Sequence, residues 1–342
     1  MAEITRLVVR APNWLGDAVM ALPALAAVRR AYEGRTIVLA ATASVAPIFQ
    51  EQTVASPDEI LVVDRSSEVE RLRAAKPDAV LLLPNSFHSA WVARVARVPE
   101  RWGYRASGRR WLLTRAVRRP RSRVHQVQYY RELVRGLGIE PADEAPRLQA
   151  RARTLEKADA LLRGNGINPS EGVVGFAPGA AYGHAKRWAP DRVAIVIQAL
   201  ARSGIVAVLV GATGDRETGR AIESALPTGT RIVNLIGRTS LTELVGVVSR
   251  CAAFVSNDSG AMHIAAALGV PLTAIFGPTD ERVTAPAGWA RADVIVRDVF
   301  CRPCLLRECP IDHRCMKRID ADTVLRSVTG HLGNREPRRV NP

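Results

Sequence analysis

Residues 7–28 read LVVRAPNWLGDAVMALPALAAV, and this stretch decides the fold. Leu7 to Val9 form a short apolar run that predicts a buried strand, and Ala18 to Val28 form a longer one that predicts a helix. A loop that carries Gly16 and Asp17 joins the two. A buried strand that leads directly into an apolar helix is the start of a βαβ unit, so the stretch predicts a parallel sheet covered by helices.

The same pattern recurs along the chain, with helix-length segments between short runs rich in β-branched residues. The further strand-like runs are Ile37 to Ala40, Ile60 to Val63, Ala79 to Leu83, Val173 to Phe176, Val206 to Val210, Ile232 to Leu235, Ala253 to Val255 and Leu272 to Phe276. Their alternation with helical segments predicts the α/β class. Two such series in 342 residues predict two domains, each large enough to bury its own core.

The boundary between the two series falls where strand signals are weak. Gly138 to Arg151 carries two prolines and several charges, and a helix predicted over Thr154 to Arg163 follows. We therefore expect domains at residues 1–160 and 161–342. Two α/β domains that face each other would form a central cleft, and ligands bind at the carboxyl ends of such strands.

Composition limits the class of protein. With 47% hydrophobic and 24% charged residues, the chain is globular rather than disordered. The longest apolar runs, Val193 to Ala201 and Gly204 to Ala212, are separated by Arg202 and are too short to span a membrane. The apolar run from Ala18 loosely resembles a secretory signal, but Asp17 lies directly against it, so we expect a cytoplasmic protein.

Charge is the most unusual bulk property. The net charge is +15, and the segment from Arg94 to Arg135, with 13 arginines and two acids, supplies +11 of it. Such a concentration predicts an anionic partner. Nucleic acid, an anionic membrane surface and a phosphorylated substrate all fit, and composition does not distinguish them.

Asp17 is the first candidate for chemistry. It lies near the start of the first predicted helix, where the helix dipole stabilises a carboxylate. It is either a helix cap or a general base that takes a proton from an acceptor hydroxyl. The loop lacks the GxGxxG fingerprint of dinucleotide-binding proteins.

The loop from Ala177 to Trp188 is the second candidate. It combines small residues with the adjacent cations Lys186 and Arg187, which suits a diphosphate because backbone N–H groups and a lysine can share its charge. The other interpretation is a solvated surface loop. Asp215 and Glu217, after another predicted strand, are candidate acceptors for ribose hydroxyls.

A third motif, Ser256 to His263, joins a predicted strand to an apolar helix. Asp258 and Ser259 are good helix caps, but the N–H groups of the same turn also form an anion site that Gly260 lets a phosphate approach. His263 is a ligand donor or a buried core residue.

Four cysteines crowd into 15 residues near the end of the chain. They are Cys301, Cys304, Cys309 and Cys315, and His313 lies among them. Four thiolates at this spacing are compatible with structural zinc or an iron–sulfur cluster. The alternatives are two disulfides or four reduced thiols, and a reducing cytosol disfavours the disulfides.

Taken together, these motifs resemble glycosyltransferase family 9, the heptosyltransferases. The matching segments are Asn13 to Asp17, Leu83 to Ala90, Trp102 to Arg105, Arg109, Leu112 to Thr114, Pro178 to Ala180, Ala185 to Trp188, Asn257 to Gly260, Met262, His263, Phe276 to Thr279 and Cys315 to Met316. They follow in order along nearly the whole chain. His88 departs from the pattern, because relatives often carry Lys or Arg there.

The resemblance implies a GT-B architecture, with two Rossmann-like domains that bind the acceptor and the nucleotide sugar respectively. It implies an inverting transfer of L-glycero-D-manno-heptose from ADP-heptose to the heptosyl-Kdo-lipid A inner core of lipopolysaccharide, without a cofactor. Asp17 would be the general base, and Lys186 would stabilise the departing ADP. The implied donor contacts are Gly179, Lys186, Asp215, Thr239, Asp258, Ser259, Gly260 and His263. The expected acceptor contacts are Asn13, Trp14, Asn85, Ser86, Arg105 and Arg109.

Further expectations follow from the resemblance. The arginine-rich segment suits an acceptor that bears Kdo carboxylates and lipid phosphates, so we expect peripheral contact with the cytoplasmic face of the inner membrane. We also expect the last helix to pack back on the N-terminal domain.

Three alternatives stay open. A family 9 transferase that uses another nucleotide sugar or acceptor is the nearest. A basic nucleic-acid-binding protein is suggested by the pI of about 10.6, although aromatic content is only 5% and no nucleic-acid motif accompanies the basic segment. A nicotinamide oxidoreductase is suggested only by the parallel sheets.

Overall fold

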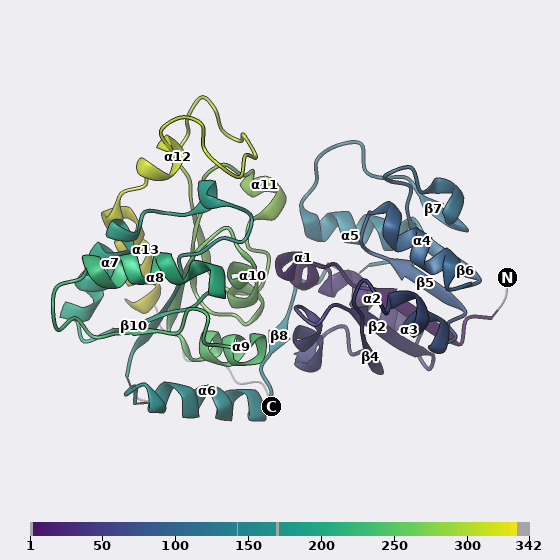
Figure 1. The fold of residues 1–342 in the computed structure, drawn as a ribbon, viewed down its shortest axis with the longest axis horizontal. Coiled ribbons are helices and arrows are strands. Elements are labelled where there is room, and N and C mark those ends of the chain that lie inside the picture. The colour runs from purple at the N-terminus through teal and green to yellow at the C-terminus, as the bar shows by residue number, and fades with distance from the viewer. Residues whose placement is uncertain (1–2, 142, 169–170, 334–342) are drawn as a thin grey trace. The chain divides into compact units, whose positions relative to one another are not determined.

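The computed structural model describes residues 3–141, 143–168 and 171–333. The chain divides into two compact units, residues 1–149 and 150–342 (Figure 1). Each unit is described by itself.

The first unit is built on a six-stranded sheet in the order β4-β2-β1-β5-β6-β7, and its pairings are parallel. Its strands are β1 (Arg6–Arg10), β2 (Thr36–Ala41), β4 (Glu59–Val62), β5 (Ala79–Leu82), β6 (Glu100–Tyr104) and β7 (Arg115–Val117), and β3 (Gln52–Thr53) pairs separately with β8 (Leu148–Gln149). Its helices are α1 (Leu15–Met20), α2 (Leu22–Ala31), α3 (Glu68–Ala74), α4 (Phe87–Val95) and α5 (Gln126–Arg135), with the 3-10 turns η1 (Ala46–Gln50) and η2 (Arg110–Leu112).

The central strand of this sheet is buried on both faces. Val8 lies between Val38 and Val80 in the parallel register, and the three side chains pack with residues of α3 and α4. Leu7 and Val9 point to the opposite face, because successive side chains of a strand alternate, and they are fully buried as well. This explains the continuous apolar run, which is typical of a parallel sheet covered by helices on both sides.

The second unit repeats the plan with a six-stranded parallel sheet in the order β11-β10-β9-β12-β13-β14. Its strands are β9 (Val173–Ala177), β10 (Val206–Leu209), β11 (Ile232–Asn234), β12 (Ala253–Asn257), β13 (Leu272–Ile275) and β14 (Ala292–Ile295). Its helices are α6 (Ala152–Gly164), α7 (Pro190–Arg202), α8 (Arg216–Ala225), α9 (Leu241–Arg250), α10 (Gly260–Ala267), α11 (Glu281–Thr284), α12 (Arg314–Lys317) and α13 (Ala321–Gly333), with the 3-10 turns η3 (His184–Lys186) and η4 (Thr213–Asp215).

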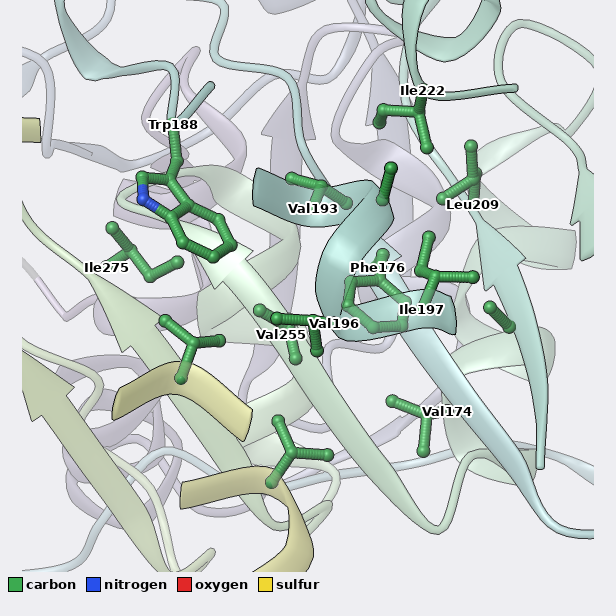
Figure 2. Close-up of a cluster of buried hydrophobic side chains, with 14 of the residues drawn as sticks. Val174, Phe176, Trp188, Val193, Val196, Ile197, Leu209, Ile222, Val255 and Ile275 are labelled. Atoms are coloured by element: carbon green, nitrogen blue, oxygen red, sulfur yellow. The ribbon is translucent and has the colours of Figure 1, made fainter. Parts of the chain in front are cut away.

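The core of the second unit lies between its sheet and α7 (Figure 2). Val174 and Phe176 of β9 pack with Val196 and Ile197 of α7 in one buried cluster. Trp188 belongs to the same cluster, and its indole Nε1 donates a hydrogen bond to the carbonyl of Ile319 at 3.0 Å. The buried indole therefore anchors the end of the loop that leaves β9.

The division between the units falls after residue 149 rather than after residue 160. Helix α6 belongs to the second unit because it packs against α9 so closely that a Cβ on Gly246 would lie 2.6 Å from the carbonyl oxygen of Thr154. A boundary at 160 would cut through this helix. The expected helix over Thr154 to Arg163 is confirmed, with one more turn in total.

The last described helix, α13, packs against α7, β12 and β13 of its own unit. His331 bonds to the carbonyl of Leu272 through its Nε2 atom at 3.1 Å. The expected contact of the last helix with the first domain stays a prediction, and residues 334–342 lie outside the described residues.

The nine strands expected from apolar runs are confirmed, with ends that shift by one or two residues. The sequence missed β6, β7 and β14, and also the short pair β3 and β8. Strand β6 reads ERWGY and β7 reads RAV, so charges interrupt the apolar signal. In the described part of the chain, no helix is long and apolar enough to cross a membrane.

Candidate functional site

In the first unit, the expected acceptor residues gather at one edge of the sheet. Strands β1, β5 and β6 are neighbours and run parallel, so the loops that leave them lie side by side. These loops carry Asn13 to Asp17, Asn85 with Ser86, and Arg105 to Arg109 respectively.

Asp17 lies in the first turn of α1, and a tyrosine from another helix contacts it. Trp14 occupies the N-cap position, so Asp17 is the third residue of the helix and not its cap. The hydroxyl of Tyr130, on α5, donates to Asp17 Oδ1 at 3.3 Å. Burial, followed by the charge of Asp17, raises the pKa of Tyr130 well above its ordinary value of 10.0. Tyr130 therefore stays protonated at neutral pH and acts as a fixed donor to the carboxylate.

The loop before Asp17 is held by a buried ion pair. Arg10 Nε lies 2.5 Å from Glu68 Oε1, and both side chains are only 6% exposed. The same guanidinium donates to the carbonyl of Ala11 and to Asn13 Oδ1 at 2.8 Å. This bond fixes the orientation of the Asn13 side chain. The neighbouring Trp14 is 57% exposed, so a ligand can reach its ring.

Hydrogen bonds hold the loop between β5 and α4, which carries Asn85 and Ser86. The Asn85 side-chain amide donates to the hydroxyl of Tyr129 at 2.9 Å, while its Oδ1 is buried and has no hydrogen-bond partner among the described residues. Ser86 caps α4 by accepting from the N–H of Ser89 at 3.2 Å. Asn85 therefore keeps an unused acceptor, and Ser86 already has a structural role.

Arg109 is fully buried, so its expected contact with the acceptor stays a prediction without an exposed surface to support it. Its guanidinium donates to the carbonyls of Tyr104, Pro84 and Ser86 and to the hydroxyl of Ser89. Burial without a carboxylate partner lowers its pKa to about 10. Arg109 thus fixes the loop that carries Asn85 and Ser86.

In the second unit, the central contact joins the loops after β9 and β12, which are neighbouring strands. Lys186 Nζ lies 2.6 Å from Asp258 Oδ2, with 12% and 6% of the two side chains exposed. The hydroxyl of Thr279 donates to the same carboxylate oxygen at 2.7 Å. The Lys186 ammonium also lies 4.8 Å from the ring centre of Tyr182. Lys186 is therefore a cation held in a fixed position at the carboxyl ends of the strands.

Asn257 fixes the loop in which Lys186 lies. Its side-chain amide donates to the carbonyl of Pro178 at 2.6 Å, and its Oδ1 accepts from the N–H of Trp188 at 3.3 Å. One buried side chain thus ties both ends of the loop to β12.

Asp215 lies directly against this loop. Its carboxylate pairs with Arg187 at 3.0 Å and accepts from the N–H of Ala212 at 3.1 Å. A Cβ on Gly179 would lie 2.1 Å from the Asp215 carboxyl carbon, so only glycine fits there. Asp215 is 7% exposed and is committed to protein partners, so its expected contact with ribose stays a prediction.

The start of α10 has the form of an anion site. Ser259 is the N-cap residue, but its hydroxyl shares a hydrogen bond with Ser256 and does not cap the first turn. Gly260 follows, and His263 is buried one turn further on. Because no side chain caps these N–H groups, an anionic ligand can bind them. Thr239 lies in the turn between β11 and α9, at the outer side of the sheet, half-buried.

The predicted metal site is not supported. Within residues 3–141, 143–168 and 171–333, no group of three His, Cys, Asp or Glu side chains is placed to hold a metal ion. The four clustered cysteines are unpaired thiols. Burial, followed by a contribution from the other three cysteines, raises the pKa of the Cys315 thiol. His313, which lies among them, bonds through Nε2 to the carbonyl of Ala185 at 2.6 Å.

The sequence missed several residues of these sites. Tyr129 and Tyr130 lie in the middle of a helix that no motif marks. Asn257 and Thr279 belong to segments that carried the resemblance, but their roles depend on contacts with distant loops. In each case the contact that gives the side chain its role joins parts of the chain that are distant in sequence.

Two Rossmann-like units, one with a carboxylate on a helix start and one with a cationic loop beside an uncapped helix, are typical of a GT-B glycosyltransferase. The family model for glycosyltransferase family 9 (heptosyltransferase) matches residues 65–314. The chain belongs to this family.

Individual heptosyltransferases are also similar to this chain in sequence and in structure. The chain is 36% identical over 220 residues to lipooligosaccharide heptosyltransferase 2 of Haemophilus influenzae, a match that covers 61% of this chain and 63% of that one, just under two thirds. It is 31% identical over 297 residues to lipopolysaccharide heptosyltransferase 2 of Escherichia coli, covering 82% and 85%. The solved structure of E. coli ADP-heptose LPS heptosyltransferase II matches with a TM-score of 0.82 and 28% identity, over 96% of this chain and 98% of that chain.

Proposed function

We propose that this chain transfers L-glycero-D-manno-heptose from ADP-heptose to the heptosyl-Kdo-lipid A inner core of lipopolysaccharide, with inversion at the anomeric carbon. The observation that carries the donor side is the Lys186–Asp258 pair at the carboxyl ends of adjacent strands. The named relatives supply the sugar and the acceptor class.

The second unit supplies the donor site in this proposal. The ADP diphosphate binds the uncapped first turn of α10 and the ammonium of Lys186, which then shares its charge between the phosphate and Asp258. Asp258 and Thr279 keep the ammonium in place before the donor binds, so little reorganisation is needed as charge develops on the leaving group.

The first unit supplies the acceptor site and the base. The acceptor hydroxyl oxygen attacks the anomeric carbon on the face opposite to ADP, and the bond from that carbon to the diphosphate oxygen breaks. Asp17 takes the proton of the hydroxyl, and Lys186 stabilises the negative charge that ADP carries away. Asn13, Asn85 and Trp14 surround the acceptor sugars. These residues supply a base and leaving-group stabilisation, so we propose that no cofactor takes part.

The location of the reaction belongs to the proposal as well. A lipid-anchored acceptor places the enzyme at the cytoplasmic face of the inner membrane, where anionic lipids attract the excess of exposed arginines.

The first experiment measures ADP release and product mass with ADP-heptose and the heptosylated Kdo-lipid A acceptor. Asp17→Asn should lose at least about a hundredfold in rate while it still binds ADP-heptose. Lys186→Ala should lose about a hundredfold and also bind the donor more weakly. Asp191→Asn, another first-turn acid, and Lys157→Ala, on α6, are matched controls that should stay active.

Each outcome has a consequence. If Asp17→Asn is as active as the wild type, Asp17 is not the base. The other outcome is a wild type that is inert with ADP-heptose and the heptosylated acceptor but transfers sugar from another nucleotide sugar in a panel. In that case the family assignment stands and the proposed donor is wrong.

A further inference from the structure

Helix α4 and the turn η2 expose three large aromatic side chains that lie together. Phe87 is 40% exposed, Trp91 46% and Trp111 66%. The ring centres of Phe87 and Trp91 are 6.3 Å apart with nearly parallel planes, and those of Phe87 and Trp111 are 6.1 Å apart. The three rings therefore form one continuous apolar surface, which we call the aromatic surface.

The spacing along α4 shows that this surface is a complete helix face. Phe87, Trp91 and Val95 are four residues apart, so they share one side of the helix, and Val95 is also exposed. The opposite side of α4 buries Ala90 and Ala93 in the core of the first unit. A helix on the surface of a globular protein normally presents polar residues on its outer side, so an outward aromatic face indicates an interaction site.

Cations surround the aromatic surface. Arg94 lies on the same side of α4 as Trp91, three residues further along, and Arg110 directly precedes Trp111. Between residues 94 and 123, eight exposed arginines have no ion-pair partner among the described residues. They are Arg94, Arg97, Arg105, Arg110, Arg118, Arg119, Arg121 and Arg123. The next two arginines along the chain, Arg131 and Arg135, are both paired with acids.

We propose that the aromatic surface and these arginines dock the enzyme on an anionic lipid bilayer. Indole rings favour the boundary between headgroups and acyl chains, and arginines bind headgroup phosphates around them. The inference deepens the proposed function and rests on it in one respect, which is that the acceptor is lipid-anchored. Ser86, an expected acceptor residue, caps α4, so the aromatic surface continues directly from the acceptor loop.

Charge favours a bilayer over a second copy of this chain. Two such surfaces brought together would place unpaired arginines against arginines, and like charges repel strongly when desolvated. An anionic lipid surface offers both the apolar layer for the rings and the phosphates for the guanidinium groups.

The test compares binding of the full chain to phosphatidylcholine vesicles with and without phosphatidylglycerol. The wild type should co-sediment with the anionic vesicles much more than with the neutral ones. The double variant Trp91→Ala/Trp111→Ala should bind at least about tenfold more weakly, because it removes the inserted rings. Phe300→Ala, which removes a 79% exposed aromatic ring in the second unit, is the matched control and should bind normally.

A second pair of variants tests the cations. Arg94→Ser/Arg110→Ser should weaken binding to anionic vesicles and reduce its sensitivity to salt, because fewer ionic contacts remain to be screened. Both double variants alter exposed side chains, and an unchanged far-UV circular dichroism spectrum checks that they fold.

The remaining outcomes separate this inference from the proposed function. Normal binding of the tryptophan variant to anionic vesicles would overturn the proposal. The proposal would also be overturned if this variant lost only self-association or only binding of duplex DNA, and kept its binding to vesicles. On a water-soluble, deacylated acceptor, the tryptophan variant should release ADP at the wild-type rate. If the wild type binds vesicles through these rings but releases no ADP with either acceptor, the docking surface stands and the proposed reaction fails.

Discussion

At the scale of single residues, the chemistry depends on side chains that hold other side chains. Tyr130 holds Asp17, Arg109 holds the loop of Asn85, and Asp258 holds Lys186. In each case the partner comes from a different loop or helix. Removing a partner should therefore change the chemistry of its neighbour without removing the neighbour itself.

Tyr130→Phe tests the first of these pairs through a pH profile. Tyr130 donates to the ionised carboxylate, and its raised pKa keeps it protonated throughout the working range. Without this donor the ionised form of Asp17 is less stabilised, so the acidic limb of kcat/KM against pH should move to higher pH. A lower rate with an unmoved limb would show that Tyr130 only packs. Tyr104→Phe, which removes a hydroxyl bonded to a backbone carbonyl, is the control.

Gly179→Ala tests the close approach between the donor loop and Asp215. The added Cβ would lie 2.1 Å from the Asp215 carboxyl carbon, so the loop must move. We expect weaker binding of ADP, by about tenfold or more, in isothermal titration. Gly214→Ala, in the loop that carries Asp215, adds a Cβ to open space and should bind ADP normally. Equal affinities for the two variants would contradict the assignment of this loop to the donor site.

At the scale of elements, buried contacts between strand ends and helices make the loops rigid. The Arg10–Glu68 pair joins the end of β1 to the first turn of α3. The guanidinium also bonds to Ala11 and Asn13 in the loop that leads to Asp17, so the pair links the position of α3 to the position of this loop.

Glu68→Ala should destabilise the protein by about 3–5 kcal/mol, because it leaves Arg10 buried without a countercharge. Urea unfolding followed by circular dichroism measures this loss. Glu59→Ala breaks the exposed pair with Arg6 and should cost less than about 1 kcal/mol. Similar losses for both variants would show that burial does not set the strength of the Arg10 pair.

At the scale of the whole molecule, the proposed function divides the substrates between the two units. The proposed donor residues all belong to residues 150–342, and the proposed base and acceptor residues all belong to residues 1–149.

Hydrogen exchange of the full chain with and without ADP tests this division. The loops after β9 and β12 should gain protection, because ADP orders their N–H groups. Residues 85–89, in the acceptor loop, should exchange as before. Equal protection of both sets would mean that ADP alone orders the acceptor loop, and the division would then be wrong.

The sequence by itself determined the α/β class, nine of the strands and the loops that carry the candidate residues. These follow from local chemistry, because buried parallel strands require continuous apolar runs and the loops after them carry Gly, Asp and Lys. It did not determine strands such as β6, whose arginine and glutamate are tolerated because its other side chains pack inward.

Only the tertiary structure decided what several residues do. Arg109 lies in an arginine-rich segment, where the sequence predicts an exposed side chain. The fold instead buries it under the loop that carries Asn85. Local sequence does not give the roles of Tyr130 and Thr279, which follow from the contacts that place them against Asp17 and Asp258. A local sequence pattern predicts the backbone conformation and the burial of an element. The partner of a side chain depends instead on how elements that are distant in sequence pack together, and a local pattern carries no information about that packing.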